Sequence, residues 1–152
     1  MAEPMPIQDT WFPELTCFGC GPANAEGLRL KSLADGEWGA TATFMPWPQH
    51  DNGLGYLNGG IIATLLDCHS AAAVVHVAHG HGWPALGGAA LPYVTAGLDV
   101  RYRRPAPLTE RVSLVAEVTA ASEDEMTCQV TLEWEGKVRA EGTALWKRWR
   151  PR

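Results

Sequence analysis

The sequence predicts an α+β protein in which an antiparallel sheet of about six strands covers one long central helix. The first observation is an apolar run from Ile61 to His79 that contains neither Gly nor Pro. The second is a series of segments rich in β-branched and aromatic residues, separated by turn-forming residues. Four of these segments follow the helix one after another, which favours antiparallel pairing between neighbours.

The size and charge of the chain are typical of one globular domain, for which we expect no nucleic-acid partner. The 152 residues suit a single domain over 1-152, with an N-terminal extension at 1–16 and a basic tail at 147–152. A net charge of -5 gives no basic footprint for nucleic acid, and the short tail does not change this. The N-terminus is acidic and lacks the apolar core of a signal peptide, so we expect a cytoplasmic protein.

Six strands are predicted from alternation and turn signals. Two precede the helix, Leu28–Leu33 and Glu37–Phe44, because Ala34-Asp35-Gly36 is typical of a turn between paired strands. The four later strands span Tyr93–Arg103, Arg111–Ala121, Met126–Trp134 and Val138–Trp146. Short turns between consecutive strands favour an antiparallel meander.

The four cysteines do not predict a metal site. Cys17 and Cys20 have zinc-like spacing, but no second pair of Cys or His follows at a suitable separation. Cys68 and Cys128 fall in the predicted helix and in a predicted strand, where each is interpreted as a small apolar residue. A reducing compartment is the simpler interpretation, with no disulfide.

The long helix is expected to lie under the sheet rather than in a membrane. Its length would cross a bilayer, about 28 Å at roughly 1.5 Å per residue. Asp67, His69 and His76 argue against a membrane, because each would be costly in hydrocarbon. Gly80 is predicted to end the helix as a left-handed C-cap.

One face of the predicted helix carries small residues around a single carboxylate. At 100° per residue this face comprises Gly60, Ala63, Thr64, Asp67, Ser70, Ala71, Val74 and Ala78. Such a face lets a ligand or a second backbone approach closely, which makes Gly60 and Ser70 candidate substrate contacts. Asp67 is either a base or nucleophile tuned by desolvation, or a structural aspartate that caps a neighbouring loop. His69 falls on the opposite side, so it forms no dyad with Asp67.

The start of the helix is a second candidate site. Asn58, Gly59 and Gly60 present backbone N–H groups at the positive end of the helix dipole, which can polarise a carbonyl or hold an oxyanion. Asn58 is at the same time a typical N-cap. Asp67 lies about 10 Å along the axis from Gly60, whereas an attacking atom must lie roughly 3–3.5 Å from its target. If both groups act, a second antiparallel copy of the helix must complete the site, as in a dimer.

The segment N-G-L-G-Y-L-N-G-G-I-I-A-T-L-L-D, residues 52–67, resembles the central-helix motif of hotdog-fold acyl-CoA thioesterases. This is the phenylacetate-degradation and thioesterase-superfamily type, whose usual pattern is N-x-x-G-x-x-H-G-G before an apolar helix with an acid. The matching residues are Asn52, Gly55, Gly59, Gly60 and Asp67. Asn58 stands where the family usually has His, and its amide cannot titrate. The opening C-F-G-C-G-P-x-N-x-x-G-L is also similar to this group, so the resemblance covers most of residues 17–146.

The resemblance implies a hotdog fold and hydrolysis of an acyl-CoA thioester to free acid and coenzyme A, by a dimer or a dimer of dimers. By this resemblance, Asp67 corresponds to the family's acid that activates water or attacks the thioester. The amide of Gly59 resembles the donor to the thioester oxygen, and Asn52 resembles the residue that orients substrate or water. Thr95 falls where a Ser or Thr commonly holds the acid; the other interpretation is a strand residue without a role. No cofactor is implied, because coenzyme A is part of the substrate.

Two further features leave alternatives open. Arg103 and Arg104 either pair with coenzyme A phosphates or form a solvated strand end. The same fold also suits a protein that binds acyl-CoA or a small apolar ligand without cleaving it. A hydratase is disfavoured, because no D-x-x-x-x-H element begins at Asp67.

Overall fold

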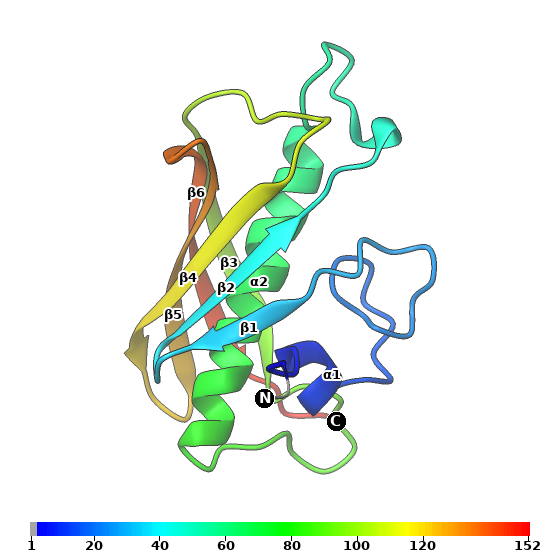
Figure 1. Cartoon of the computed structure of the whole chain (residues 1–152). Helices are drawn as coiled ribbons and strands as arrows, with labels where there is room; N and C mark the ends of the chain where they lie inside the picture. Colours follow the sequence, from blue (N-terminus) through cyan, green and yellow to red (C-terminus); the bar gives the residue numbers. More distant parts are fainter. Residues whose placement is uncertain (1–2) are drawn as a thin grey trace.

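A computed structural model describes residues 3–152 and shows a six-stranded antiparallel sheet curved around one long helix (Figure 1). The helices are α1 (Ile7–Trp11) and α2 (Gly59–Gly80), with a short 3-10 turn at Pro48–His50. The strands are β1 (Ser32–Asp35), β2 (Gly39–Phe44), β3 (Tyr93–Tyr102), β4 (Val112–Ala121), β5 (Glu125–Trp134) and β6 (Lys137–Arg148). The predicted hotdog arrangement, an antiparallel sheet wrapped around a central helix, is confirmed.

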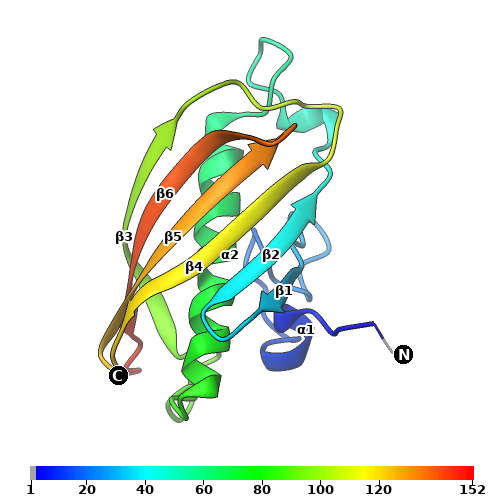
Figure 2. The same cartoon turned by 60° about the vertical axis from the view of Figure 1, so that its left-hand side comes forward.

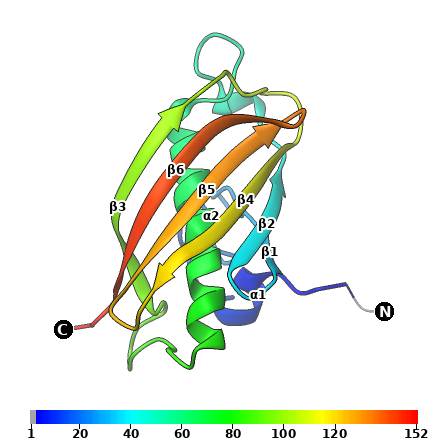
Figure 3. The same ribbon diagram turned by 90° about the vertical axis from the view of Figure 1, so that its left-hand side faces the viewer.

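The helix α2 forms the centre of the hydrophobic core. Thirteen of its residues are buried, and Leu65, Leu66 and Val74 are completely inaccessible to solvent. It is long and apolar enough to cross a bilayer, but 72% of its most apolar window is buried inside the protein, as expected for a core helix. Figures 2 and 3 show the strands lying along α2 and bending around it.

The ends of α2 differ from the predicted ends. Asn58 is the N-cap, and its Oδ1 accepts hydrogen bonds from the amides of Gly60 (2.7 Å) and Ile61 (3.2 Å), so the helix begins two residues before Ile61. The left-handed cap predicted at Gly80 is wrong, because Gly80 is still helical. The positive φ occurs two residues later, at Gly82 (+74°).

The strand order is β1-β2-β4-β5-β6-β3, so the predicted meander holds only for β4, β5 and β6. The strand β3 lies at the sheet edge beside β6 and is not a neighbour of β4. The reason is that the segment 103–111 crosses the sheet at the end where α2 begins. There the amides of Arg103 and Arg104 donate to the carbonyl of Arg139, and the buried Ala106 accepts from the amide of Leu57.

The first strand is shorter than predicted. It begins at Ser32 rather than at Leu28, although Leu28 and Leu30 are buried as strand residues would be. Their amides donate to carbonyls of the preceding loop instead of to a neighbouring strand, and Arg29 between them has a positive φ of 54°. The apolar alternation therefore reports burial here rather than strand pairing.

The predicted N-terminal extension packs against the core. Residues 1 and 2 of this extension lie outside the described residues. In the described part Ile7 and Phe12 are buried, and the ring of Trp11 stacks on His79 at 3.6 Å between centroids. The short helix α1 thus covers part of α2 beside β1.

The predicted basic tail is partly wrong, because its first two residues complete β6. The guanidinium of Arg148 is buried and donates to the carbonyls of Trp83 (3.0 Å), Pro84 (2.6 Å) and Pro92 (3.5 Å). These carbonyls belong to the connection between α2 and β3, so Arg148 anchors that connection. The sequence predicted a basic tail from residue 147 onward, but these carbonyl acceptors stabilise the buried guanidinium of Arg148.

A buried polar network fixes β1 and β2 on α2. His69 is fully buried, its Nδ1 lies 2.8 Å from Ser32 Oγ, and its Nε2 lies 3.0 Å from the carbonyl of Ala40. A carbonyl only accepts, so Nε2 carries the proton and Nδ1 accepts from the Ser32 hydroxyl. Gln8 of α1 completes the network by donating to Ser32 Oγ. His69 therefore has a structural role on the side of α2 opposite Asp67.

Candidate active site

Asp67 lies in the middle of α2 on the part of the small-residue face that the sheet leaves half-exposed. The hydroxyl of Thr95 on β3 donates to Asp67 Oδ1 at 2.8 Å. Desolvation raises the pKa of Asp67, the hydrogen bond from Thr95 opposes this, and the negative charge of a nearby Cys17 thiolate raises it further. The carboxylate is thus held by one donor in a partly dry environment.

A β-bulge accompanies the contact between Thr95 and Asp67. The register between β3 and β6 shifts between Thr95 and Gly97. Bulges re-aim side chains and are frequent beside functional sites. The position of Thr95 against Asp67 matches the family position named from the sequence, while its part in catalysis stays a prediction.

Ser70 is not a substrate contact in this structure. It is fully buried, its hydroxyl donates to the carbonyl of Asp67 (2.7 Å), and it accepts from Trp146 Nε1 (3.0 Å). The predicted face is therefore divided. Its first half, around Asp67, is partly exposed, and its second half packs against the sheet, with Ala71, Val74 and Ala78 buried.

At the start of α2 only one of the three predicted amides is free. The Asn58 amide donates to the carbonyl of His50, and the Gly60 amide donates to the Asn58 side chain. The Gly59 amide has no hydrogen-bond partner among residues 3–152. Tyr102 donates to the Gly59 carbonyl at 2.7 Å and fixes the first turn. The predicted use of the Asn58 and Gly60 amides for a ligand is therefore corrected, while the Gly59 amide remains a donor.

A surface pocket of about 340 Å³ lies beside this amide. Its lining consists of Asn52, Tyr56, Leu57, Gly59, Ile62, Tyr102, Arg103, Arg104, Pro105 and Ala106. Two of the predicted substrate-binding residues, Arg103 and Arg104, thus lie at the same pocket as Gly59 and Asn52. Arg103 is paired with Glu141, whereas Arg104 forms no ion pair within residues 3–152.

Asn52 shapes the loop that borders this pocket. Its Oδ1 accepts from the amides of Leu54 (2.8 Å) and Tyr56 (3.3 Å). Gly53 and Gly55 adopt positive φ of 90° and 85°, which permits the tight turn. The side-chain amide of Asn52 makes no hydrogen bond within the described residues, so it remains available as a donor at the pocket.

Asp67 is not part of this pocket. It lies eight residues after Gly59, which is about 12 Å along the axis at roughly 1.5 Å per residue. The chain thus presents two separate half-sites: a helix terminus with a free amide and arginines, and a carboxylate held by Thr95.

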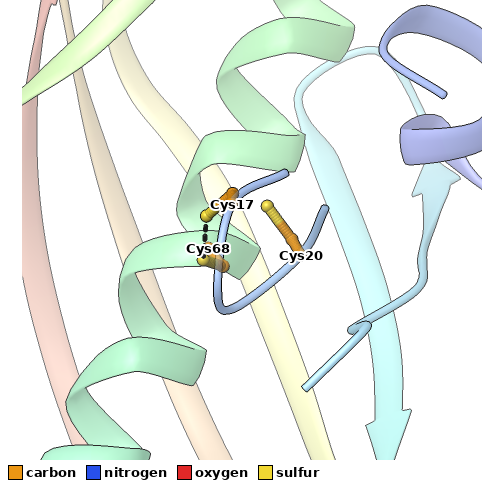
Figure 4. A group of neighbouring side chains, drawn as sticks. All are labelled: Cys17, Cys20 and Cys68. Atoms are coloured by element: carbon orange, nitrogen blue, oxygen red, sulfur yellow. Dashed lines mark hydrogen bonds between the residues drawn. The ribbon is translucent and has the colours of Figure 1, made fainter. Parts of the chain in front are cut away.

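The structure also assembles a group that sequence spacing did not predict. The sulfurs of Cys17, Cys20 and Cys68 all lie within 4.8 Å of one another, and Figure 4 shows them gathered between a loop and α2. The interpretation of Cys68 as an ordinary core residue is therefore incomplete. No spacing rule joins Cys68 to Cys17 and Cys20, since the contact depends on how the loop folds over the helix.

The comparisons with known proteins identify the family. The model of the thioesterase superfamily matches residues 54–144, more than half of the chain. The chain therefore belongs to the thioesterase superfamily, which confirms the resemblance drawn from residues 52–67. No curated protein matches the chain.

Solved structures of the same superfamily share the fold. A thioesterase superfamily protein from Shewanella loihica is 27% identical with a TM-score of 0.64, covering 85% of this chain and 98% of that one. Mouse thioesterase superfamily member 2 is 23% identical with a TM-score of 0.65, covering 80% of this chain and 83% of that one. The Escherichia coli PaaI protein from the phenylacetic acid degradation operon is 18% identical with a TM-score of 0.68, covering 84% and 85%. The last two identities show the common fold alone.

Replacing Thr95 tests its support of the carboxylate. Thr95→Val removes the only donor to Asp67 within residues 3–152 and should lower the free energy of unfolding by about 1–2 kcal/mol at pH 7, because the acceptor is charged but partly solvated. Thr95→Ser keeps the hydroxyl and should stay within about 0.5 kcal/mol of the wild type. Urea unfolding at one fixed protein concentration measures both. A Thr95→Val protein as stable as the wild type would contradict the inferred role.

Proposed function

We propose that the protein hydrolyses an acyl-CoA thioester to the free acid and coenzyme A. The observation that carries the proposal is Asp67, a half-buried carboxylate oriented by Thr95 on the exposed part of the central helix of a thioesterase-superfamily fold. A carboxylate with a raised pKa is a stronger base than an ordinary aspartate, which suits it to activate water.

In this reaction Asp67 acts as general base. It takes a proton from water, the resulting hydroxyl bonds to the carbonyl carbon, and the carbon–sulfur bond breaks. The proton then passes to the departing coenzyme A sulfur. The alternative is that Asp67 attacks the carbonyl carbon itself, so that the carbon–sulfur bond breaks and the coenzyme A thiolate leaves. Water then hydrolyses the resulting mixed anhydride to the free acid and the Asp67 carboxylate, and one of the protons released goes to the thiolate.

The free amide of Gly59 polarises the thioester carbonyl. It lies at the positive end of the α2 dipole, where a developing oxyanion is stabilised. Asn52 at the same pocket orients the reacting group through its side-chain amide. Arg104, and Arg103 if it leaves Glu141, are suited to the phosphates of coenzyme A.

The two half-sites must come from different subunits. A rigid helix keeps Gly59 and Asp67 about 12 Å apart, whereas the attacking atom and the carbonyl carbon must meet within roughly 3.5 Å. An antiparallel copy of α2 across a two-fold axis brings the Asp67 of one subunit to the Gly59 of the other. We therefore propose a homodimer, alone or as half of a tetramer, acting in the cytoplasm without a cofactor.

A binding protein that does not cleave its ligand is the second candidate, favoured by the replacement of the family His by Asn58. Incubating the protein with a panel of acyl-CoAs and a thiol reagent separates the two functions. Release of thiol that depends on Asp67 supports the enzyme. Saturable binding without release supports the binding protein.

Replacing Asp67 removes the base. Asp67→Asn should lower kcat by about 100- to 10,000-fold, because the amide cannot accept the proton from water. The far-UV circular dichroism should not change, since the amide is nearly isosteric. Asp35→Asn, at the exposed end of β1, which meets α2 near His76 and not near Asp67, is the matched control and should keep full activity. An Asp67→Asn protein with kcat within severalfold of the wild type would exclude the assignment.

Replacing Gly59 tests the amide donor itself. Gly59→Pro removes the N–H group at the first helical position, where proline is well tolerated, and should lower kcat by about 100- to 1,000-fold. Gly59→Ala adds a methyl group at van der Waals distance from Tyr102 but keeps the N–H group, so it should retain most activity. Equal activity of the two variants at the most active acyl-CoA would rule out an amide role.

A further inference from the structure

The cysteine cluster lies beside Asp67, but none of its three sulfurs forms or breaks a bond in the proposed reaction. Cys68 directly follows Asp67 on α2, while Cys17 and Cys20 come from the loop that precedes β1. Cys20 and Cys68 are buried, and Cys17 is half-exposed. All three are free thiols.

The loop is built to place its two sulfurs against α2. The Gly21 amide donates to the Cys17 carbonyl at 2.8 Å, which closes the C-F-G-C-G turn. A methyl group at Gly19 would overlap the Cys68 sulfur and the Thr64 methyl group, so only glycine allows this approach to the helix. The turn therefore lies directly over Cys68.

We propose that Cys17, Cys20 and Cys68 together bind a thiophilic divalent cation, with Zn²⁺ as the physiological ion. In a tetrahedral zinc site with Zn–S bonds of about 2.3 Å, neighbouring sulfurs lie about 3.8 Å apart. The Cys17 and Cys68 sulfurs are already 3.7 Å apart, and Cys20 lies within 4.8 Å of both. A shift of the Cys20 sulfur by about 1 Å would complete this geometry.

The chemistry of the three thiols suits a metal ion. Hydrogen bonding to the Cys20 and Cys68 thiols lowers the pKa of Cys17, and the backbone amides of Cys20 and Gly19 lower it further. The interaction with Cys17 and burial raise the pKa of Cys20 and of Cys68. A divalent cation would compensate the charge of all three thiolates. Cys17 is half-exposed, so a water molecule would supply the fourth ligand.

A disulfide would involve only two of the three cysteines. It requires two sulfurs at about 2.05 Å and leaves the third thiol without a partner. Three sulfurs that all lie within 4.8 Å of one another fit one metal ion better. The metal interpretation is independent of the proposed hydrolysis.

The site has a clear structural consequence. Residues 12–31 contain turns but no helix or strand, which is long for an irregular segment in a compact domain. A metal ion held by Cys17, Cys20 and Cys68 would cross-link this segment to α2 one residue from Asp67. It would thereby stabilise both the loop and the part of the helix that carries the carboxylate.

Zinc titration of the full chain tests the proposal. After reduction and metal removal, the protein should take up one Zn²⁺ per chain in competition with a chromophoric chelator. Loss of an outer-shell partner already weakens metal binding by about 10- to 100-fold, so Cys17→Ala, Cys20→Ala and Cys68→Ala should each weaken it by at least about 100-fold. Cys128→Ala is the matched control, because Cys128 is a buried free cysteine of β5 outside the cluster, and it should bind as the wild type does.

Two further measurements on the wild-type protein keep the test decisive if a variant fails to fold. Co²⁺ should give the near-ultraviolet charge-transfer absorption of thiolate ligation, and Zn²⁺ should protect Cys17 from alkylation. The proposal is overturned if the reduced, folded protein takes up no Zn²⁺, or if uptake persists in all three cluster variants. It is equally overturned if the purified protein holds a Cys17 disulfide and binds no Zn²⁺ after reduction.

Discussion

The environment of Asp67, and with it the candidate active site, depends on how much of α2 the sheet covers. Most of the helix is enclosed, with Leu65, Leu66 and His69 inaccessible to solvent, but the face around Asp67 remains half-exposed. A carboxylate enclosed on all sides would be neutral or strongly destabilising, and a fully solvated one would keep its ordinary pKa. Asp67 lies between these limits, with Thr95 as its donor. Because the helix is rigid, the same geometry holds this carboxylate away from the amide of Gly59, and this separation leads to the proposal of a site shared by two subunits.

The features that the sequence predicted well are those determined by neighbouring residues. The N-cap at Asn58 and the apolar run after it define α2, because capping and helical periodicity act within a few residues. The later strands were located to within a residue or two for the same reason. The contact between Asp67 and Thr95 joins distant residues, and it followed from the family resemblance rather than from any local pattern.

The features that the sequence missed depend on contacts between distant segments. The strand β3 lies at the sheet edge because the 103–111 connection crosses the sheet. The turn-forming residues in the sequence show how long this connection is, but they do not show which strand the chain pairs with next. Ser70 accepts a hydrogen bond from Trp146, and the guanidinium of Arg148 donates to carbonyls of the connection between α2 and β3. Both side chains are buried although they are polar, because distant segments supply their hydrogen-bond partners. The cluster around Cys68 was missed because its partners approach only when the loop folds over α2.

The most direct measurement of the shared site uses mixed dimers that carry Asp67→Asn in one subunit and Gly59→Pro in the other, isolated through two different affinity tags. Each parent dimer lacks a required group in both sites. The mixed dimer has one site in which Asp67 and Gly59 are both intact, so it should show about half of the wild-type activity per dimer. Mixed dimers that assemble correctly yet remain as inactive as both parents would contradict the account.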